Sequence, residues 1–395
     1  MTRIRTRILI SALAVLIIGG IWFYYAYFMS TNAAIRHAEA FLFRRMTVTQ
    51  LAEQGEYRHF FVTNRVMESG EAPLENRFTT ERQETLGFGT FDTNIEPSLG
   101  LGMIINPTEW FQNEEIQLSD IRELDESDFV AGLGRYVNES PGRSLLIVIH
   151  GFREEFPSAL RKTAFIASVL DINTPVLVFD WPGDQGSSLR GYRQARTVAQ
   201  ASGVDLARLI GIIVREIGPD HLSLIANSMG GQVVADAFKV LYAHADLADA
   251  EKELDHVVLT APDVDHAEFN ERFKDEIKAF ANDLTVYVSS NDRALLMSRL
   301  INRGTRLGES TLSTDQLAEA ESLSRLVEPD SNLISLVDVT PVNRTRNFHN
   351  FSLETPEFFD DLYLRLTSDD TPRNRLIYRV QTPEESVYWV LTRGR

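Results

Sequence analysis

The feature that most constrains the fold of this chain is an alternation of short apolar segments with helical ones, which begins at residue 144. Three segments are almost continuously apolar: 144–152, 175–184 and 221–226. The segments between them, 158–171 and 191–218, have the residue spacing of helices. Because strands without polar alternation are buried on both faces, the pattern predicts an α/β fold with a mostly parallel sheet and helices on both faces.

The same pattern continues toward the C-terminus, with a helix expected at 232–244 and further strands at 255–265, 284–292 and 332–340. In sheets of this kind the ligand site lies beyond the carboxyl ends of the strands. The residues that follow the expected strands are therefore the candidates for a functional site. They are residues 150–152, 180–183, 227–231, 262–265 and Asp292.

Ser228 stands at a sharp junction between an apolar strand and a helix. The stretch from Ala226 to Gly230, "ANSMG", matches the nucleophile elbow G-x-S-x-G, with alanine in place of the first glycine. In such a turn the serine is held at the top of the sheet, and the following helix points the positive end of its dipole at the site. The alternative interpretation is that Ser228 is the N-cap of a helix whose first turn contains glycine.

A serine nucleophile needs a base, and in this kind of fold the chain order is Ser, then Asp or Glu, then His. Four histidines follow Ser228: His244, His256, His266 and His349. His244 ends the helix that follows the elbow, and His256 precedes its strand instead of following it. His266 comes too early for the chain order Ser, acid, His. His349 lies in a loop after the last of these strands and can reach over the sheet, so it is the predicted base.

The acid is expected at Asp292, which ends the strand before the one that leads to His349. Asp263 or Asp265, at the end of the preceding strand, is the alternative acid. The carboxylates not used would be structural, bonding loop backbones or capping helices.

The oxyanion formed during acyl transfer needs preorganised donors. One is expected to be the N–H of Met229, directly after the nucleophile, and the second the N–H of Phe152, in the loop after the first strand. Gly151 gives that loop its freedom to turn. Asn227 and Gly230 are the supporting residues of the elbow.

Residues 57–365 resemble the α/β-hydrolases, and more narrowly the bacterial esterase-like subgroup called domain of unknown function nine hundred. The matching stretches occur in order: "FFVTNR" (60–65), "IVIHGF" (147–152), "VFDWPGDQGS" (178–187) with Tyr192 after it, "LIANSMGG" (224–231), "LTAPDVDHAEF" (259–269), "VYVSSNDRAL" (286–295) and "FHNFSL" (348–353). The resemblance implies the α/β-hydrolase fold and serine hydrolase activity on an ester. The subgroup usually has histidine before the nucleophile, where this chain has Asn227, a position outside the triad.

Residues 8–29 form an uncharged apolar run behind Arg3, Arg5 and Arg7. A membrane-spanning helix needs about 20 residues, whereas the apolar core of a signal peptide has only about 7–15. We therefore expect residues 1–30 to be a transmembrane anchor; the alternative is a signal peptide cleaved near residues 33–34. The arginines would stay in the cytoplasm, which predicts a single-pass protein of the bacterial inner membrane with its hydrolase domain on the periplasmic side.

The net charge of the chain is −17. Residues 1–29 carry three arginines and no acid, so the rest of the chain has a net charge of −20. This argues against a nucleic-acid partner, which needs a basic face. The absence of cysteine removes disulfides, thiol nucleophiles and thiolate metal sites. No H-E-x-x-H or G-x-x-x-x-G-K motif occurs, so neither a metal nor another cofactor is expected.

Together with the anchor, three further segments give the chain four predicted parts. Residues 31–56 are expected to form a helical stalk, residues 57–366 the hydrolase domain, and residues 367–395 a hairpin-like extension. Within the domain, residues 303–331 are either a lid over the site or a solvated insertion.

The sequence thus predicts a serine hydrolase that cleaves carboxylic esters through an acyl-enzyme, with a small-molecule or lipid ester as substrate. Two alternatives stay open. One is an acyltransferase or peptidase that uses the same triad. The other is a catalytically inactive hydrolase fold that serves as an interaction module of the cell envelope.

Overall fold

The computed structural model describes residues 17–19, 44–52, 55–95, 116–243, 254–265, 268–269, 273–289, 292, 334–345, 349–367, 377–381 and 387–392. Met46–Arg395 form one compact unit and Met1–Arg45 another. The expected anchor lies outside the described residues except for 17–19, which are helical, and it stays a prediction. The segment expected to be a lid or insertion, 303–331, also lies outside them.

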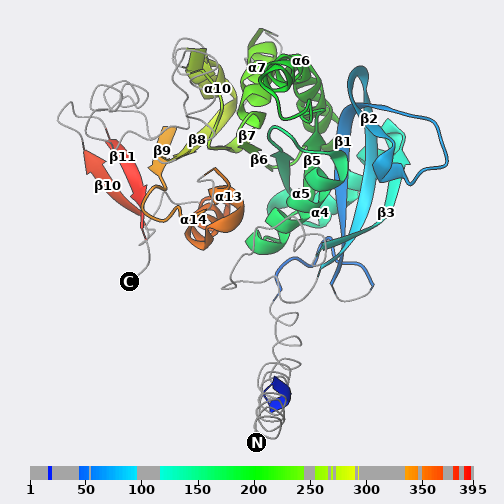
Figure 1. The fold of residues 1–395 in the computed structure, drawn as a ribbon, viewed down its shortest axis with the longest axis horizontal. Coiled ribbons are helices and arrows are strands. Elements are labelled where there is room, and N and C mark those ends of the chain that lie inside the picture. The colour runs from blue at the N-terminus through cyan, green and yellow to red at the C-terminus, as the bar shows by residue number, and fades with distance from the viewer. Residues whose placement is uncertain are drawn as a thin grey trace, which may run out of the picture. The chain divides into compact units, whose positions relative to one another are not determined.

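Within the described part of the chain, eleven strands form one sheet in the order β10-β11-β9-β8-β7-β6-β4-β5-β1-β2-β3 (Figure 1). The strands are β1 (Glu56–Met67), β2 (Phe78–Ile95), β3 (Ile116–Leu124), β4 (Ser144–Ile149), β5 (Val176–Asp180), β6 (His221–Asn227), β7 (Leu254–Thr260), β8 (Ala281–Val288), β9 (Ile334–Asp338), β10 (Ile377–Gln381) and β11 (Val387–Leu391). Neighbouring strands from β11 to β1 pair in parallel. The antiparallel pairs β1–β2, β2–β3 and β10–β11 lie toward the two edges.

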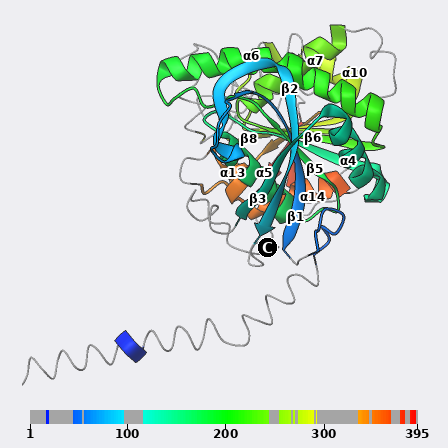
Figure 2. The same ribbon diagram turned by 90° about the vertical axis from the view of Figure 1, so that its right-hand side faces the viewer.

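Helices cover both faces of this sheet. They are α4 (Glu126–Glu139), α5 (Phe156–Leu170), α6 (Leu189–Ile212), α7 (Gly230–Ala243), α10 (Lys274–Phe280), α13 (Phe351–Glu354) and α14 (Pro356–Thr367). A π-helical turn, η3 (Ile213–Ile217), continues α6, and two short 3₁₀ turns are η1 (Leu74–Asn76) and η2 (Pro141–Arg143). Helices α6, α7 and α10 lie on one side of the sheet and α5, α13 and α14 on the other (Figures 1 and 2).

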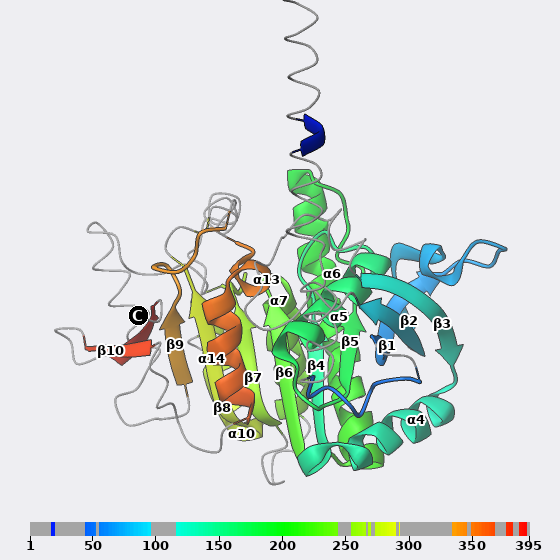
Figure 3. The same ribbon diagram turned by 90° about the horizontal axis from the view of Figure 1, so that it is seen from below.

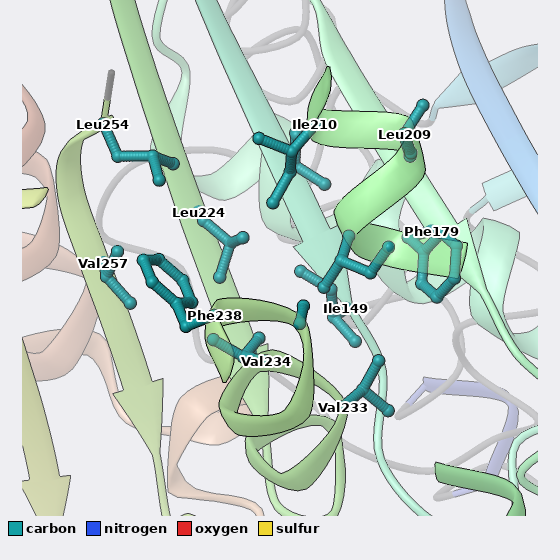
Figure 4. Close-up of a cluster of buried hydrophobic side chains, with 14 of the residues drawn as sticks. Ile149, Phe179, Leu209, Ile210, Leu224, Val233, Val234, Phe238, Leu254 and Val257 are labelled. Carbon is teal, nitrogen blue, oxygen red and sulfur yellow. The ribbon is translucent and has the colours of Figure 1, made fainter. Parts of the chain in front are cut away.

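Each face of the sheet buries its own apolar core, because successive side chains of a strand point to opposite faces. In β4, Ile147 and Ile149 belong to the core under α4, α6, α7 and α10, while Leu146 and Val148 belong to the core under α5, α13 and α14. Figure 4 shows part of the first core, where Phe238 of α7 lies among side chains of the central strands. Seen from below, α14 and α5 lie against the other face (Figure 3). This double burial explains the unbroken apolar runs in the sequence.

The structure confirms the mostly parallel α/β architecture with helices on both faces. The expected C-terminal hairpin is formed by β10 and β11, and it is part of the central sheet because β11 pairs in parallel with β9. The described residues contain one helical run, Leu189–Ile217, with the length and apolar character to span a membrane, and most of its apolar part is buried in the domain.

The prediction of a helical stalk is wrong for residues 46–52, which are extended or in turns. Met46 is buried, and the N–H groups of Thr47 and Val48 both donate to Oδ1 of Asn173 at 2.8 Å. Gln50 forms an antiparallel bridge with Tyr57 of β1. The segment satisfies its backbone against the loop after α5 instead of within a helix, and residues 31–43 lie outside the described part of the chain.

A buried histidine in β1 makes the stability of this fold depend on pH. The side chain of His59 is fully buried, with Nε2 3.2 Å from Oγ1 of Thr93 and its ring 5.2 Å from that of Phe91. Among the described residues, Nδ1 has no hydrogen-bond partner. Burial lowers the pKa of His59 from 6.5 to about 3, because a charged imidazole would lose its hydration there.

We predict that the substitution His59→Asn makes the free energy of unfolding less dependent on pH. Between pH 6.5 and 3, the unfolded chain binds a proton at His59 that the folded chain does not, so this residue lowers stability as the pH falls. From pH 7 to pH 5 its contribution is about 2 kcal/mol. Urea unfolding of both proteins at the two pH values measures this, and an identical pH dependence would contradict the assignment.

Candidate active site

Ser228 occupies a left-handed turn between β6 and α7, with a φ of 53°. Its N–H donates to the carbonyl of Thr260 at 2.9 Å, and its own carbonyl accepts from the N–H groups of Gly231 and Asp263, each at 3.0 Å. A non-glycine residue in this region costs about 1–3 kcal/mol and persists only where the surroundings fix it. The elbow expected from the sequence is therefore a strained turn held by three backbone hydrogen bonds.

Two glycines allow other backbone segments to approach this turn. A Cβ atom at Gly230 would lie 2.6 Å from the carbonyl oxygen of His150 and 2.9 Å from that of Ile149. A Cβ atom at Gly151 would lie 3.1 Å from Cβ of Ser228. The start of α7 thus packs closely against the end of β4, and the loop after β4 packs against the serine, so side chains at these two positions would force the segments apart.

Asn227, directly before the serine, is held from two elements. Its Oδ1 accepts from Oγ1 of Thr260 at 3.0 Å and from Oγ of Ser352 at 3.3 Å. Ser352 lies in α13, three residues after His349. Asparagine at this position therefore connects the elbow with the segment that carries the predicted base.

His349 and Asp292 come together although 57 residues separate them in the chain. Asp292 follows β8 and is almost fully buried, and its Oδ2 lies 2.7 Å from Nδ1 of His349. A carboxylate only accepts hydrogen bonds, so Nδ1 carries the proton and Nε2 is the unprotonated, basic nitrogen of the neutral ring. Burial lowers the pKa of His349, but the charge and hydrogen bond of Asp292 and the charge of Asp263 outweigh it, and the pKa is raised above 6.5.

The two alternative acids have other partners. Oδ2 of Asp263 accepts from the hydroxyl of Tyr192 at 2.5 Å, and the carboxyl group of Asp263 is buried. Oδ1 of Asp265 accepts from the N–H of Glu268 at 3.3 Å, as a cap of the following turn would. Asp263 nevertheless lies at the site, because its N–H bonds to the carbonyl of Ser228 and its charge acts on His349.

The two residues expected to supply the oxyanion donors lie in the loops around the elbow. Met229 follows the serine, and its side chain is buried in the core under α7. Phe152 follows Gly151, and its ring packs edge-on against that of Tyr192 at 5.7 Å. Tyr192 therefore contacts both the Phe152 loop and Asp263.

His150 follows strand β4 directly and is buried, where it packs against and bonds Trp181. Its ring stacks on Trp181 with the centroids 5.6 Å apart, and its Nε2 accepts from the N–H of Trp181 at 3.1 Å. Nε1 of Trp181 donates to the carbonyl of His150 at 2.9 Å. These contacts fix the end of β4 against the loop after β5.

The structure places the predicted residues in two groups. Gly151, Asn227 and Asp263 contact the turn of Ser228, while Asp292 pairs with His349. The described ranges contain no group of three His, Asp or Glu side chains that could hold a metal ion. The arrangement offers a strained serine at a helix start and, in the second group, a histidine hydrogen-bonded to a carboxylate.

Sequence reasoning assigned no role to several residues of the site. Tyr192 and Ser352 belong to stretches that resemble the family but carry no signal of a role by themselves, and the bond of Tyr192 to Asp263 spans 71 residues. Lys162 and Glu154 form an ion pair near His349, and Lys162 lowers the pKa of that histidine. No local signal identifies these contacts, because each joins elements that are distant in the chain.

Two solved structures are similar to this chain at low identity. A cold-adapted esterase from an Arctic intertidal metagenomic library is 11% identical with a TM-score of 0.38, and the match covers 80% of this chain and 97% of that one. The thermophilic esterase Est2 from Thermogutta terrifontis is 13% identical with a TM-score of 0.31, and the match covers 58% and 86%. A search of curated protein sequences gives no match. With TM-scores below 0.5, these likenesses carry no argument about activity.

A protein-family model gives a more direct result. The family described as "Alpha/beta hydrolase of unknown function (DUF900)" matches residues 125–362, which are more than half of the chain. The match begins before α4 and ends within α14, so it includes the elbow, Asp292 and His349. The chain therefore belongs to the alpha/beta hydrolases of unknown function of the DUF900 family.

Proposed function

We propose that this protein is a serine hydrolase that cleaves carboxylic esters, with Ser228 as nucleophile, His349 as base and Asp292 as the orienting acid. The observation that carries the proposal is the contact of 2.7 Å between Nδ1 of His349 and Oδ2 of Asp292, and the left-handed turn of Ser228 supports it. Membership of an alpha/beta hydrolase family supports it.

The proposed mechanism follows from the hydrogen bond of Nδ1. With Nδ1–H donated to Asp292, Nε2 of His349 takes the proton of Ser228 while the serine oxygen attacks the ester carbonyl. The N–H groups of Met229 and Phe152 stabilise the resulting oxyanion. His349 then gives its proton to the departing alcohol, and water repeats the sequence on the acyl-enzyme to release the acid and free the serine.

We predict that a fluorophosphonate probe labels the full-length protein and that Ser228→Ala abolishes the labelling. The same substitution should reduce turnover of an aryl ester by about a millionfold, since members of a triad act as a unit. Gel fluorescence and steady-state kinetics measure the two effects. A folded wild-type protein that neither reacts with the probe nor hydrolyses esters would instead favour an inactive fold that acts as an interaction module.

Removing the charge of Asp292 should lower activity far more than removing that of Asp263. We expect Asp292→Asn to lower kcat about 10⁴-fold, because the asparagine amide would impose the wrong imidazole tautomer. Asp263→Asn should cause a far smaller loss, since Asp263 bonds Tyr192 and acts on His349 through its charge. Side-by-side kinetics of the two variants decide the assignment, and a larger loss in the Asp263 variant would make Asp263 the acid.

The pH dependence of the reaction should report the raised pKa of His349. The base must be neutral to accept a proton, so kcat/KM should fall as the pH decreases through a midpoint above 6.5. Asp263→Asn should move this midpoint to lower pH, because it removes a negative charge that favours the imidazolium. A pH profile of both proteins tests this, and an unchanged midpoint in the variant would contradict the role of that charge.

A further inference from the structure

Helix α6 and the turn η3 that continues it carry a row of arginines on their outer face. Arg190 and Arg208 are five helical turns apart in the chain, so they lie on the same side of the helix. Arg193 and Arg215 lie within about 60° of that side. All four side chains are exposed, and the row is about 35 Å long. The helix thus presents one continuous row of positive charge to solvent.

No acidic side chain of the helix neutralises this row. Asp205 is the only acid between Leu189 and Arg215 in the sequence. It is buried, and its Oδ2 accepts from Nε of Arg82 at 2.8 Å and from Nδ2 of Asn64 at 2.6 Å. Within the described ranges of the chain, none of the four arginines of the row forms an ion pair. Their charges therefore remain available to a partner.

Helix α7 packs beside α6 on the same face of the sheet and leaves the layer cationic (Figure 2). Its one acid, Asp236, is partly buried and accepts from Nε2 of Gln232 at 2.7 Å, whereas its Lys239 is exposed. The rest of the protein is acidic, because the chain has a net charge of −17 and residues 1–29 contribute three positive charges to it. The layer of α6 and α7 is therefore a cationic face on an acidic domain.

The same layer holds most of the large apolar side chains that the domain exposes. Five are exposed among the domain's described residues, and three of them belong to α6 and α7: Leu189 at 57%, Val204 at 53% and Tyr242 at 50%. Val204 lies in the row, between Arg193 and Arg208. Apolar side chains among arginines suit the boundary of a bilayer, where arginines meet lipid phosphates and apolar groups leave water.

We propose that the outer face of α6 is a docking surface for a bilayer that contains anionic phospholipids. Lipid phosphates would pair with the arginines of the row, while Leu189 and Val204 enter the headgroup boundary. Such attraction falls off within a Debye length, about 8 Å at physiological salt, so the acidic remainder of the domain does not cancel it. Docking would instead orient the domain, because the acidic faces are repelled by the same surface.

The predicted anchor supports a bilayer as the partner of this face. Residues 30–43 lie between the predicted anchor and the described part of the domain. A segment of this length spans at most about 50 Å when fully extended. An anchored domain would therefore stay within reach of the bilayer surface, where four arginines suffice to select one orientation.

The test places a label that senses the loss of water on the docking surface. The full-length chain contains no cysteine, so Val204→Cys gives a single site for the fluorophore NBD. Tyr378→Cys is the control label, because Tyr378 is also half exposed but lies on β10 at the edge of the sheet. Each labelled protein is reconstituted with vesicles of phosphatidylcholine alone or with one third phosphatidylglycerol. Emission is recorded at about 0.1 M and about 1 M salt, where the Debye length is about 10 Å and about 3 Å.

We expect the label at position 204 to gain intensity and shift to the blue only in vesicles with phosphatidylglycerol, and to lose this response at the higher salt. Arg193→Gln combined with Arg208→Gln should lower the ratio of docked to undocked protein about 25-fold, at about fivefold for each arginine near an anionic surface. Arg344→Gln combined with Arg379→Gln removes the same charge from two exposed arginines outside α6 and should leave the ratio unchanged.

Three outcomes would overturn the docking surface: an equal response in both kinds of vesicle, an equal response of the label at position 378, or an equal loss in the control pair of arginines. A response at position 204 to soluble polyglutamate but not to the anionic vesicles would also overturn it and would assign the face to an acidic protein. Docking requires no chemistry at Ser228. An inactive protein can therefore pass this test, and an active esterase can fail it.

Discussion

The left-handed backbone of Ser228 is the constraint on which the site depends. The turn is held by hydrogen bonds to Thr260 and Asp263, Gly151 packs closely against Ser228, and Gly230 lets the start of α7 approach the end of β4. These contacts require the ends of β4, β6 and β7 to lie level, and the parallel register does this by placing Ile149, Ala226 and Leu259 side by side. The packing of the central sheet therefore sets the position of the serine and of the loop beside it.

A buried ion pair supports the same end of the sheet. Nε of Arg65 in β1 lies 2.8 Å from Oδ2 of Asp180, and neither side chain is more than 2% exposed. The same arginine donates to the carbonyls of Glu154 and Trp181, so one side chain bonds the loops after β4 and β5. Breaking a buried pair by removing one partner typically costs about 3–5 kcal/mol. The arginine thus ties a strand near the edge of the sheet to the loop that carries the proposed oxyanion donor.

Much of this architecture could be predicted because its signals are local. The apolar runs of the central strands and the short elbow sequence each report on a few consecutive residues, and the order of Ser228, Asp292 and His349 follows from the chain. The edge strand β3 gave no clear pattern, since its residues are mostly partly or fully exposed and acidic residues are frequent in it. The prediction of a stalk helix is wrong at residues 46–52 because Asn173, more than 120 residues away, accepts hydrogen bonds from their backbone.

The sequence by itself determined the class of fold, the strained serine turn and the candidates for base and acid, because strand burial and turn chemistry are written in neighbouring residues. Only the tertiary structure decided which carboxylate bonds His349, that Tyr192 bonds Asp263, and that Lys162 and Glu154 form an ion pair in the lining of a small cavity. These contacts depend on distances between elements far apart in the chain. The packing of two helical layers on one sheet fixes such distances. They cannot be predicted from any single stretch of the sequence.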